Sequence, residues 1–383
     1  MTSRLEKTER PVTWGFIFRV ILKAALLFAL CNLAFTVLMP VESLGQLSLY
    51  NTLLPGRERL PYGENSAQSY NLSLYNIPAM MNSHIVARPK APDEFRLLLI
   101  GDSATWGWFL ENKDTLAGRI NAGGYRTASG KRLVAHNLGY PIMSLTKDLL
   151  LLDAAMQYQP DMIVWLVTLE SFPRDKQLAH PILQNNSARV RRLIETYPLK
   201  LDPRDARFVE PDFLGRTIVG QRRALADWLR LQLYGVSWAA TGIDQAIPHE
   251  IPLRQSDFDE DIRWQNSTGP LAEDALAFDV LAAGIQRAGD VPVLIVNEPM
   301  YISSGKNSQL RYNSFYPRWA YDAYRQQLFL RSQASGWYML DAWESIASDE
   351  FTNTPVHLTP KGSAQLAEQA SVVILRIANQ GAK

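Results

Sequence analysis

The chain has 383 residues, with 39 basic and 38 acidic side chains and a formal net charge of +1. This balance creates no broad positive field to attract nucleic acid, and the sequence has no Lys/Arg block with interleaved aromatic residues. A single cysteine, Cys31, excludes an intramolecular disulfide and a thiolate metal site. The length predicts one large domain with additions, or two domains.

The segment 14–39 is the only one long and apolar enough to cross roughly 30 Å of hydrocarbon as a helix. Basic residues precede this segment and lie in its first turns: Arg4, Lys7, Arg10, Arg19 and Lys23. By the positive-inside rule, residues 1–13 stay in the cytoplasm. The remainder of the chain would then lie on the other side of the membrane.

Two other interpretations of this segment are weaker. A cleaved signal peptide needs a small-residue cleavage site after the apolar run. The segment LMPVESLGQ offers only Ser43 and Gly45, and the residues before them fit such a site poorly. A lipoprotein box ahead of Cys31 fails because Phe28 and Leu30 stand where small residues are needed. We therefore expect an uncleaved signal anchor, which makes this a single-pass membrane protein with lipid as a partner.

Residues 40–93 are polar, rich in Asn, Ser, Tyr and Pro, and lack sustained periodicity. We interpret them as an extended juxtamembrane arm. The many Tyr and Leu side chains argue against free disorder, so the arm is expected to lie against the main domain at 94–383.

Strands and helices alternate after the arm. Strands are expected at 95–101, 131–139, 161–170, 291–299 and 336–343. Helices are expected at 115–121 with Asp114 as N-cap, and at 145–158, 271–288, 319–335 and 360–378. Such alternation predicts an α/β fold, with a parallel sheet covered by helices on both faces.

The interval 172–269, between the third and fourth expected strands, is too long for a crossover and predicts an insertion. Its segment 216–244 contains one amphipathic helical stretch. This helix either packs on the domain or faces a membrane surface or a partner.

The run FRLLLIGDS at 95–103 reads as a buried strand that stops at Gly-Asp-Ser. The carboxyl end of a parallel strand is where α/β proteins place reactive groups, so Ser103 is a candidate nucleophile and Asp102 a candidate catalytic residue. A serine hydroxyl needs a base. Of the five histidines, His357 is best placed, on the loop before the last expected helix. Alternatively, Gly-Asp-Ser is a plain β-to-α turn and His357 caps its helix.

Three motifs in this order, GDSATWG (101–107), NLG (137–139) and VHLTPKG (356–362), resemble those of the SGNH hydrolase superfamily, the GDSL-like esterases. The resemblance covers roughly 95–171 and 290–378. It implies a three-layer α/β/α sandwich whose parallel sheet has about five strands, similar to flavodoxin.

The resemblance also implies roles for individual residues. Ser103 matches the nucleophile, and its backbone N–H would be one oxyanion donor. Gly139, in the motif that begins at Asn137, matches the glycine whose N–H is another donor. His357 matches the general base, which takes the proton from Ser103 and returns it to the leaving group.

At the third strand the chain departs from the family pattern. The family's third motif supplies an Asn side chain to the oxyanion hole, whereas here Glu170 falls at about that place. An ionised carboxylate there would repel the oxyanion. Either Glu170 points elsewhere, or it is protonated, or another donor such as Asn297 fills the role.

A second departure concerns the acid that orients the base. The family places an Asp three residues before the His, and here that position is Thr354. Asn353 could accept a hydrogen bond from the imidazole and fix its tautomer, although without a charge to stabilise imidazolium. Other candidates nearby for the acid that orients His357 are Asp341, Asp349 and Glu350.

The sequence therefore predicts a membrane-anchored, extracytoplasmic serine esterase or O-acyltransferase, in which O-acetyl transfer on an envelope polysaccharide or another ester is expected. A multi-span membrane acyltransferase is a possible partner, and a disulfide-free exported domain points to a bacterial source. No HExxH, paired CxxC or acidic cluster suggests a metal, and no phosphate loop suggests a nucleotide, so no cofactor is implied.

The competing hypothesis is an inactive SGNH-fold subunit that binds a glycan or a partner in an envelope complex. Geometry discriminates between the two, because an enzyme needs the Oγ of Ser103 within hydrogen-bond reach of His357. In an inactive subunit these two groups can lie apart, or Trp106, Trp108 or the insertion can fill the cleft. In an enzyme, the same two tryptophans either line an acyl or sugar pocket or belong to the core.

Overall fold

The computed structural model describes residues 13–63, 74–242, 244, 247–251, 271–272, 274–305 and 307–380. Part of the expected insertion 172–269, namely residues 243, 245–246 and 252–269, lies outside the described residues, as do residues 1–12 of the expected cytoplasmic N-terminus 1–13.

Five parallel strands form one sheet in the order β2-β1-β3-β4-β5. The strands are β1 (Glu94–Ile100), β2 (Arg132–Asn137), β3 (Met162–Val167), β4 (Val293–Asn297) and β5 (Tyr338–Asp341). This order is that of doubly wound, flavodoxin-like sheets. The expected parallel α/β fold is confirmed, and each predicted strand is present with its bounds shifted by a few residues.

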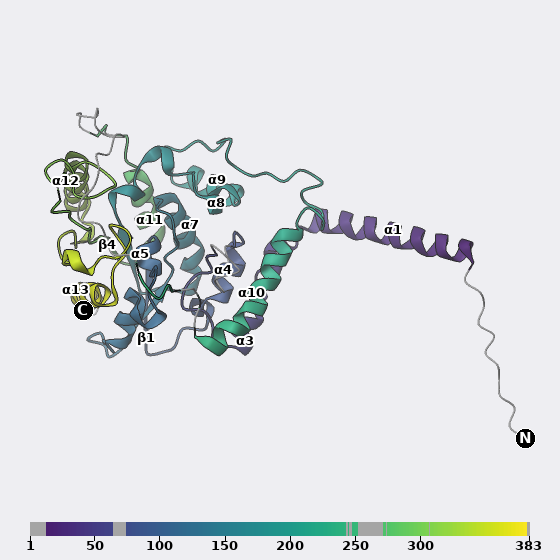
Figure 1. The fold of residues 1–383 in the computed structure, drawn as a ribbon, viewed down its shortest axis with the longest axis horizontal. Coiled ribbons are helices and arrows are strands. Elements are labelled where there is room, and N and C mark those ends of the chain that lie inside the picture. The colour runs from purple at the N-terminus through teal and green to yellow at the C-terminus, as the bar shows by residue number, and fades with distance from the viewer. Residues whose placement is uncertain are drawn as a thin grey trace, which may run out of the picture.

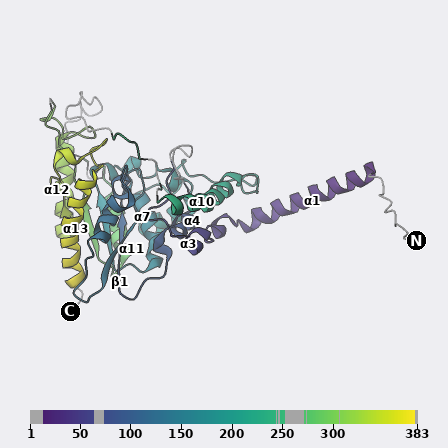
Figure 2. The same ribbon diagram turned by 60° about the horizontal axis from the view of Figure 1, so that its bottom comes forward.

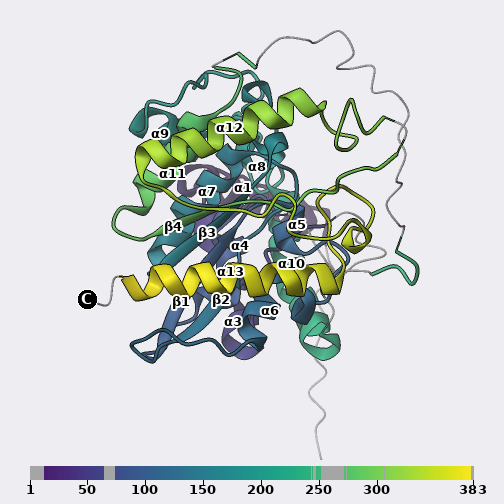
Figure 3. The same cartoon turned by 90° about the vertical axis from the view of Figure 1, so that its left-hand side faces the viewer.

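Helices cover both faces of the sheet, which makes three layers (Figure 3). Successive side chains of a strand point to opposite faces. Leu98 and Trp165 pack with one set of helices and Leu97 and Val164 with the other. The first set is α7 (Leu145–Ala155), α11 (Phe278–Ala288) and α12 (Arg318–Ser335), and the second is α6 (Leu116–Ala122) and α13 (Pro360–Gln380).

The N-cap of α6 lies one residue later than predicted. Its N-cap is Thr115, whose hydroxyl accepts a hydrogen bond from the N–H of Gly118 at 3.1 Å. Asp114 lies in the preceding 3-10 turn and pairs with Arg119 at 2.6 Å instead. Both residue types are good caps, so the sequence alone could not separate these neighbours.

The helix α1 (Trp14–Leu38) extends away from the rest of the molecule (Figure 1). Its length and composition are sufficient to cross a membrane, and few of its side chains are buried. It is therefore a candidate membrane span that coincides with the predicted segment 14–39.

The described residues of the arm, 40–63 and 74–93, are not extended. Its described part contains α2 (Val41–Leu44), α3 (Leu49–Leu53) and α4 (Ile77–Ser83). Leu60, Ile77 and Met80 are buried in the same core as β1 and α7. Helices this short are not stable alone, so they depend on packing against the domain. They are also too short to show a helical periodicity from which they could be predicted.

The described residues between β3 and β4 also form α8 (Pro181–Gln184), α9 (Ser187–Thr196) and α10 (Arg222–Thr241), in addition to α11. The helix α10 buries Leu231 and Trp238 and lies beside α3 of the arm, near the end of α1 (Figure 2). The Trp238 ring meets Tyr50 edge-on at 5.9 Å between ring centroids. The arm and this segment therefore pack together on the side of the molecule from which α1 emerges.

Candidate active site

Ser103 is presented by a sharp turn at the carboxyl end of β1. The strand ends at Ile100, and the short helix α5 (Ser103–Trp106) begins three residues later. Asp102 is the N-cap of α5, with its Oδ1 accepting a hydrogen bond from the N–H of Ala104 at 2.7 Å. The carboxylate therefore holds the turn and does not reach His357.

His357 lies on the loop that precedes α13, and its side chain meets Ser103. The Nε2 of His357 is 2.8 Å from the Oγ of Ser103, and its Nδ1 is 2.9 Å from the Oδ1 of Asn353. An amide oxygen only accepts hydrogen bonds, so Nδ1 must carry the proton. Nε2 is then free to accept the proton of the Ser103 hydroxyl, which is the tautomer that a general base requires.

The backbone around His357 is fixed by its own loop. The N–H of His357 donates to the hydroxyl of Thr354 at 3.2 Å, and its carbonyl accepts from the N–H of Thr352 at 2.8 Å. Thr354, which stands where the family pattern has an acid, is thus a turn residue. Asn353, one residue earlier, is the side chain that contacts the imidazole.

Burial makes the imidazole neutral. The side chain of His357 is enclosed, and desolvation lowers its pKa to about 3. The Trp108 ring stacks on the imidazole, with 5.8 Å between centroids and 18° between planes. The base is therefore unprotonated at neutral pH and ready to accept a proton.

Ser103 and His357 open into a cleft of about 560 Å³. Aromatic side chains line parts of its wall: Tyr62, Trp108 and Phe315. Trp106 is different, because it is 1% exposed and its indole N–H donates to the carbonyl of Leu60 at 2.9 Å. Trp108 thus borders the cleft, whereas Trp106 belongs to the core.

Glu170 lines this cleft, which rules out the alternative that its side chain points away from the site. Its carboxylate forms an ion pair with Lys176, whose Nζ also lies 3.3 Å from the hydroxyl oxygen of Tyr316. Burial and the nearby Glu170 carboxylate raise the pKa of Tyr316. The Glu170 carboxylate on the wall of this cleft is therefore paired with an ammonium group. The sequence did not predict this ion pair, because no motif or periodicity relates residues 170 and 176.

The NLG turn braces the nucleophile turn from behind. The Oδ1 of Asn137 accepts from the N–H of Gly139 at 3.1 Å, and its Nδ2 donates to the carbonyl of Trp106 at 3.2 Å. A Cβ at Gly139 would lie 2.5 Å from the backbone nitrogen of Trp106, so only glycine allows this approach. In the structure the Gly139 N–H is thus already bonded to the Asn137 side chain.

Asn297 has both ends of its amide occupied within the fold. Its Nδ2 donates to Asp341 at 2.8 Å, and its Oδ1 accepts from the Tyr324 hydroxyl at 3.1 Å. These contacts join β4, β5 and α12, and Asn297 does not line the cleft. Of the other acids near the histidine, Asp341 is held by Asn297 and Arg325, and Glu350 by Thr359 and Lys361.

Buried charges lie behind the nucleophile turn. The Nζ of Lys147 donates to the carbonyls of Gly101 at 2.7 Å and Tyr140 at 2.5 Å, and it pairs with Asp148 at 2.7 Å. Burial raises the pKa of Asp102 to about 6. Burial and the neighbouring carboxylates raise that of Glu298 well above its usual value. Lys147 thus connects the loop after β1, which leads to Ser103, with the loop after β2, which contains Gly139. A lysine within the apolar run of α7 is unusual, so the sequence alone could have marked it as a candidate buried charge.

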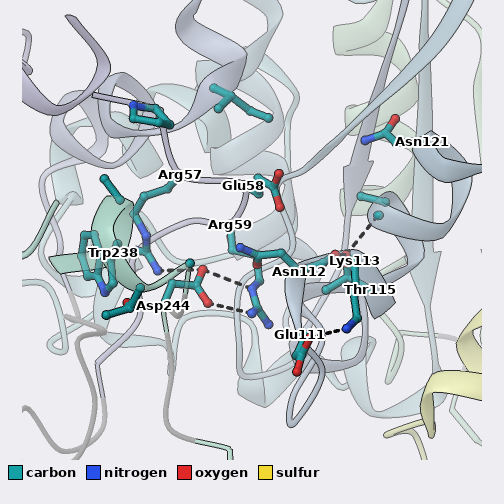
Figure 4. A pocket seen from close by; sticks show the side chains of 18 of the residues that line it. Arg57, Glu58, Arg59, Glu111, Asn112, Lys113, Thr115, Asn121, Trp238 and Asp244 are labelled. Atoms are coloured by element: carbon teal, nitrogen blue, oxygen red, sulfur yellow. Dashed lines mark hydrogen bonds and ion pairs between the residues drawn. The ribbon is translucent and has the colours of Figure 1, made fainter. Parts of the chain in front are cut away.

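A second cavity, of about 690 Å³, lies beside the arm (Figure 4). Arg59 and Arg57 of the arm converge there on Asp244, with the Arg59 Nη2 at 2.7 Å from Oδ1 and the Arg57 Nη2 at 3.2 Å from Oδ2. The Nη1 of Arg59 also donates to the carbonyl of Gly107 at 2.9 Å. The arm thereby contacts the backbone directly after α5, the element that carries Ser103.

No protein-family model matches this chain, and no curated protein matches it. Among solved structures, it is similar to a "putative arylesterase" from Agrobacterium tumefaciens str. C58, with 13% identity, 73% of this chain and 97% of that chain covered, and a TM-score of 0.34. It is also similar to a carbohydrate acetylesterase from Sinorhizobium meliloti, with 10% identity, 74% and 99% coverage, and a TM-score of 0.32. Because both TM-scores are below 0.5, neither likeness bears on the activity of this chain.

Proposed function

We propose that the chain is a membrane-anchored serine esterase or O-acyltransferase of the SGNH type, with its main domain outside the cytoplasm. The hydrogen-bonded series Ser103–His357–Asn353 carries this proposal. It joins a hydroxyl, an unprotonated imidazole and an orienting amide at distances of 2.8 and 2.9 Å on the wall of a cleft. That is the arrangement that activates a serine for acyl transfer.

In the proposed reaction, the Oγ of Ser103 attacks the carbonyl carbon of an ester while its proton moves to the Nε2 of His357. The tetrahedral intermediate collapses, the C–O bond to the alcohol breaks, and His357 returns the proton to the departing oxygen. Water or a second hydroxyl, deprotonated by His357, then attacks the carbonyl carbon of the acyl-Ser103. The bond from that carbon to the Ser103 Oγ breaks, and His357 returns the proton to this oxygen. Water as acceptor gives an esterase, and a sugar hydroxyl gives an O-acyltransferase.

The charges near the serine shape this reaction. Asn353 orients the imidazole but supplies no negative charge to stabilise the imidazolium, so the base is weaker than in a complete triad. The ammonium of Lys176 offsets the repulsion that the Glu170 carboxylate would exert on the oxyanion. Activity is therefore compatible with a glutamate at this position.

An acylated glycan is the substrate that we favour. Aromatic rings are suited to packing against sugar rings, and Tyr62 and Trp108 line the cleft that also contains Ser103. A span at α1 would hold the domain at an envelope surface, where acetylated polysaccharide and a multi-span acyltransferase partner would be within reach. The acetyl group and these partners belong to the proposal as expectations from the family resemblance.

Labelling with a fluorophosphonate probe tests the mechanism. The full chain should be labelled, whereas Ser103→Ala and His357→Ala should lose the label almost completely. Ser335→Ala and His249→Ala, which remove an exposed serine and an exposed histidine, are matched controls and should label like the wild type. A folded wild type that takes no label would favour the non-catalytic, glycan-binding subunit.

Acetate release separates the two reaction types. An esterase should release acetate from acetylated oligosaccharides in buffer alone. An acyltransferase should release little until an acceptor oligosaccharide is added, and should then produce the acetylated acceptor. Release that survives Ser103→Ala would count against the proposed nucleophile.

A further inference from the structure

A polar residue in the apolar helix α1 is paired with a loop far along the chain. Asn32 lies near the carboxyl end of α1, and its Nδ2 donates to the carbonyl of Phe28 at 2.9 Å. Its Oδ1 accepts from the backbone N–H of Ile218 at 3.1 Å. One turn further on, Thr36 is the buried residue of this helix. The residues before α10 therefore pack against the last turns of α1.

We call residues 211–221 the contact loop. Its backbone is braced from within: Gly215 N–H donates to Asp212 at 2.6 Å, and the Thr217 hydroxyl donates to the Leu214 carbonyl at 2.7 Å. The amide of Gln221 donates to the Gly215 carbonyl at 2.7 Å. A loop that satisfies part of its own backbone is suited to a water-poor environment, where unpaired polar groups are costly.

The contact loop turns its large apolar side chains outward. Phe213 is 59% exposed, Leu214 71% and Val219 51%. Side chains of this kind are normally covered, and the loop lies against α1, the one helix in the described part of the chain that is long and apolar enough to cross a membrane. The apolar exposure continues on neighbouring elements: Leu229, Leu233 and Val236 of α10, and Leu49 and Leu53 of α3.

Arginines flank these apolar side chains. Arg216, Arg222 and Arg223 are exposed, and the side chain of Arg223 is 93% exposed. Long basic side chains beside an apolar surface place their charges at the level of anionic lipid headgroups. The charge pattern thus matches a bilayer surface better than a second protein core.

The depth of the contact loop is consistent with the outer leaflet. At 1.5 Å per residue, Asn32 lies about 9 Å from the carboxyl end of α1 at Leu38, in the half of the helix that would cross the outer leaflet. A loop that contacts Asn32 would lie at the acyl-chain and headgroup boundary.

We propose that the contact loop inserts Phe213, Leu214 and Val219 into the outer leaflet beside α1, with Arg216 of the loop and Arg222 and Arg223 of α10 at the headgroups. This inference rests on the proposed membrane span and goes beyond the proposed activity. Two contacts would fix the orientation of the domain above the bilayer, whereas one helix followed by a free linker would not.

Spin-label accessibility tests the proposal on the full chain. In a Cys31→Ser background, one label each is placed at Leu214→Cys in the contact loop, Leu27→Cys in α1 and Leu330→Cys in α12. All three native side chains are more than half exposed, which limits the effect on folding. The protein is reconstituted in vesicles of phosphatidylethanolamine and phosphatidylglycerol. Collision with oxygen, which concentrates in the bilayer, is compared with collision with a water-soluble nickel chelate.

The label at 214 should favour oxygen over nickel several-fold more than the label at 330 does, and should resemble the label at 27. If 214 behaves like 330 while 27 is in the bilayer, the span exists and the contact loop proposal is wrong. If 27 is also in water, the span and the contact loop both fail, and labelling of Ser103 still reports separately on the proposed activity.

Discussion

Asn353 is the residue that sets the tautomer and the basicity of His357 in the proposed mechanism. Its Oδ1 accepts the Nδ1 proton of His357 at 2.9 Å, which fixes the tautomer without supplying charge. Asn353→Asp places a carboxylate at the same distance, which should stabilise the imidazolium formed during attack. We expect the fluorophosphonate labelling rate at pH 7 to rise by roughly tenfold or more.

Asn353→Ala provides the opposite change, because it removes the acceptor. Its labelling rate should fall well below that of the wild type while circular dichroism stays unchanged. An Asp variant that labels no faster than the wild type would mean that Asn353 is not the group that limits the base.

The pH dependence of labelling follows from the pKa of His357. Burial lowers that pKa to about 3, so the neutral base persists as the pH falls and is lost only on passing through about 3. The labelling rate should therefore stay nearly flat from pH 7 to pH 5, where an exposed histidine with a pKa near 6.5 would already have lost its activity. In Asn353→Asp, the added charge raises the pKa of His357 and the acid limb should move to higher pH.

Rates measured from pH 7 to pH 5, with circular dichroism at each pH, would check this profile. A wild-type limb centred near pH 6.5 would show that the imidazole is more solvated than its surroundings indicate.

The sequence predicts which candidate residues the fold brings together better than it predicts their surroundings. Ser103 and His357 were identifiable because each lies beside an expected strand or helix end and carries reactive chemistry. Asn353 was identifiable by its distance from His357 along the chain. Lys176 was not, since its ion pair with Glu170 depends on how the loop after β3 folds, and no periodicity encodes that fold.

The arm contributes a structural element to the nucleophile turn. Arg59 donates to the Gly107 carbonyl at 2.9 Å, and Asp244 holds the same guanidinium at 2.7 Å. Both side chains are buried. Asp244→Ala would leave Arg57 and Arg59 without their shared counterion, and breaking a buried ion pair in this way costs about 3–5 kcal/mol.

We therefore expect Asp244→Ala to lower the free energy of unfolding in urea by about that amount. Arg59→Lys, which keeps the charge but loses the forked contact with Asp244 and the Gly107 carbonyl, should also slow labelling of Ser103. Arg88→Lys alters an exposed arginine of the same arm and serves as the matched control. Equal labelling rates for Arg59→Lys and Arg88→Lys would show that the arm does not position the nucleophile.

Elements with strong local signals were predicted, and elements that depend on packing were not. The apolar run of β1 and the Thr359–Pro360 start of α13 are local sequence signals. For this reason the predicted bounds of both elements are close to the observed ones. The helices of the arm are a few residues long and are held by Leu60, Ile77 and Met80 in the shared core. Their existence is a consequence of tertiary contacts that a single sequence does not display.

At the scale of the whole molecule, the sheet order explains why residues 103 and 357 meet. All five strands are parallel, so the loops after β1 and β5 emerge at the same edge. The alternation of strands and helices predicted that edge. It could not predict how the segment between β3 and β4 packs beside the arm and α1, because nothing local specifies contacts between residues so far apart.

The proposed topology gives a last prediction for the intact molecule. The basic residues before and within the start of α1 should keep the N-terminus in the cytoplasm and place the cleft outside. In a Cys31→Ser background, a membrane-impermeant maleimide should label Ser335→Cys, at an exposed site of the main domain, on intact spheroplasts. Ser3→Cys should be labelled only after the membrane is permeabilised. The reverse pattern would place Ser103 in the cytoplasm, where an envelope glycan could not reach it.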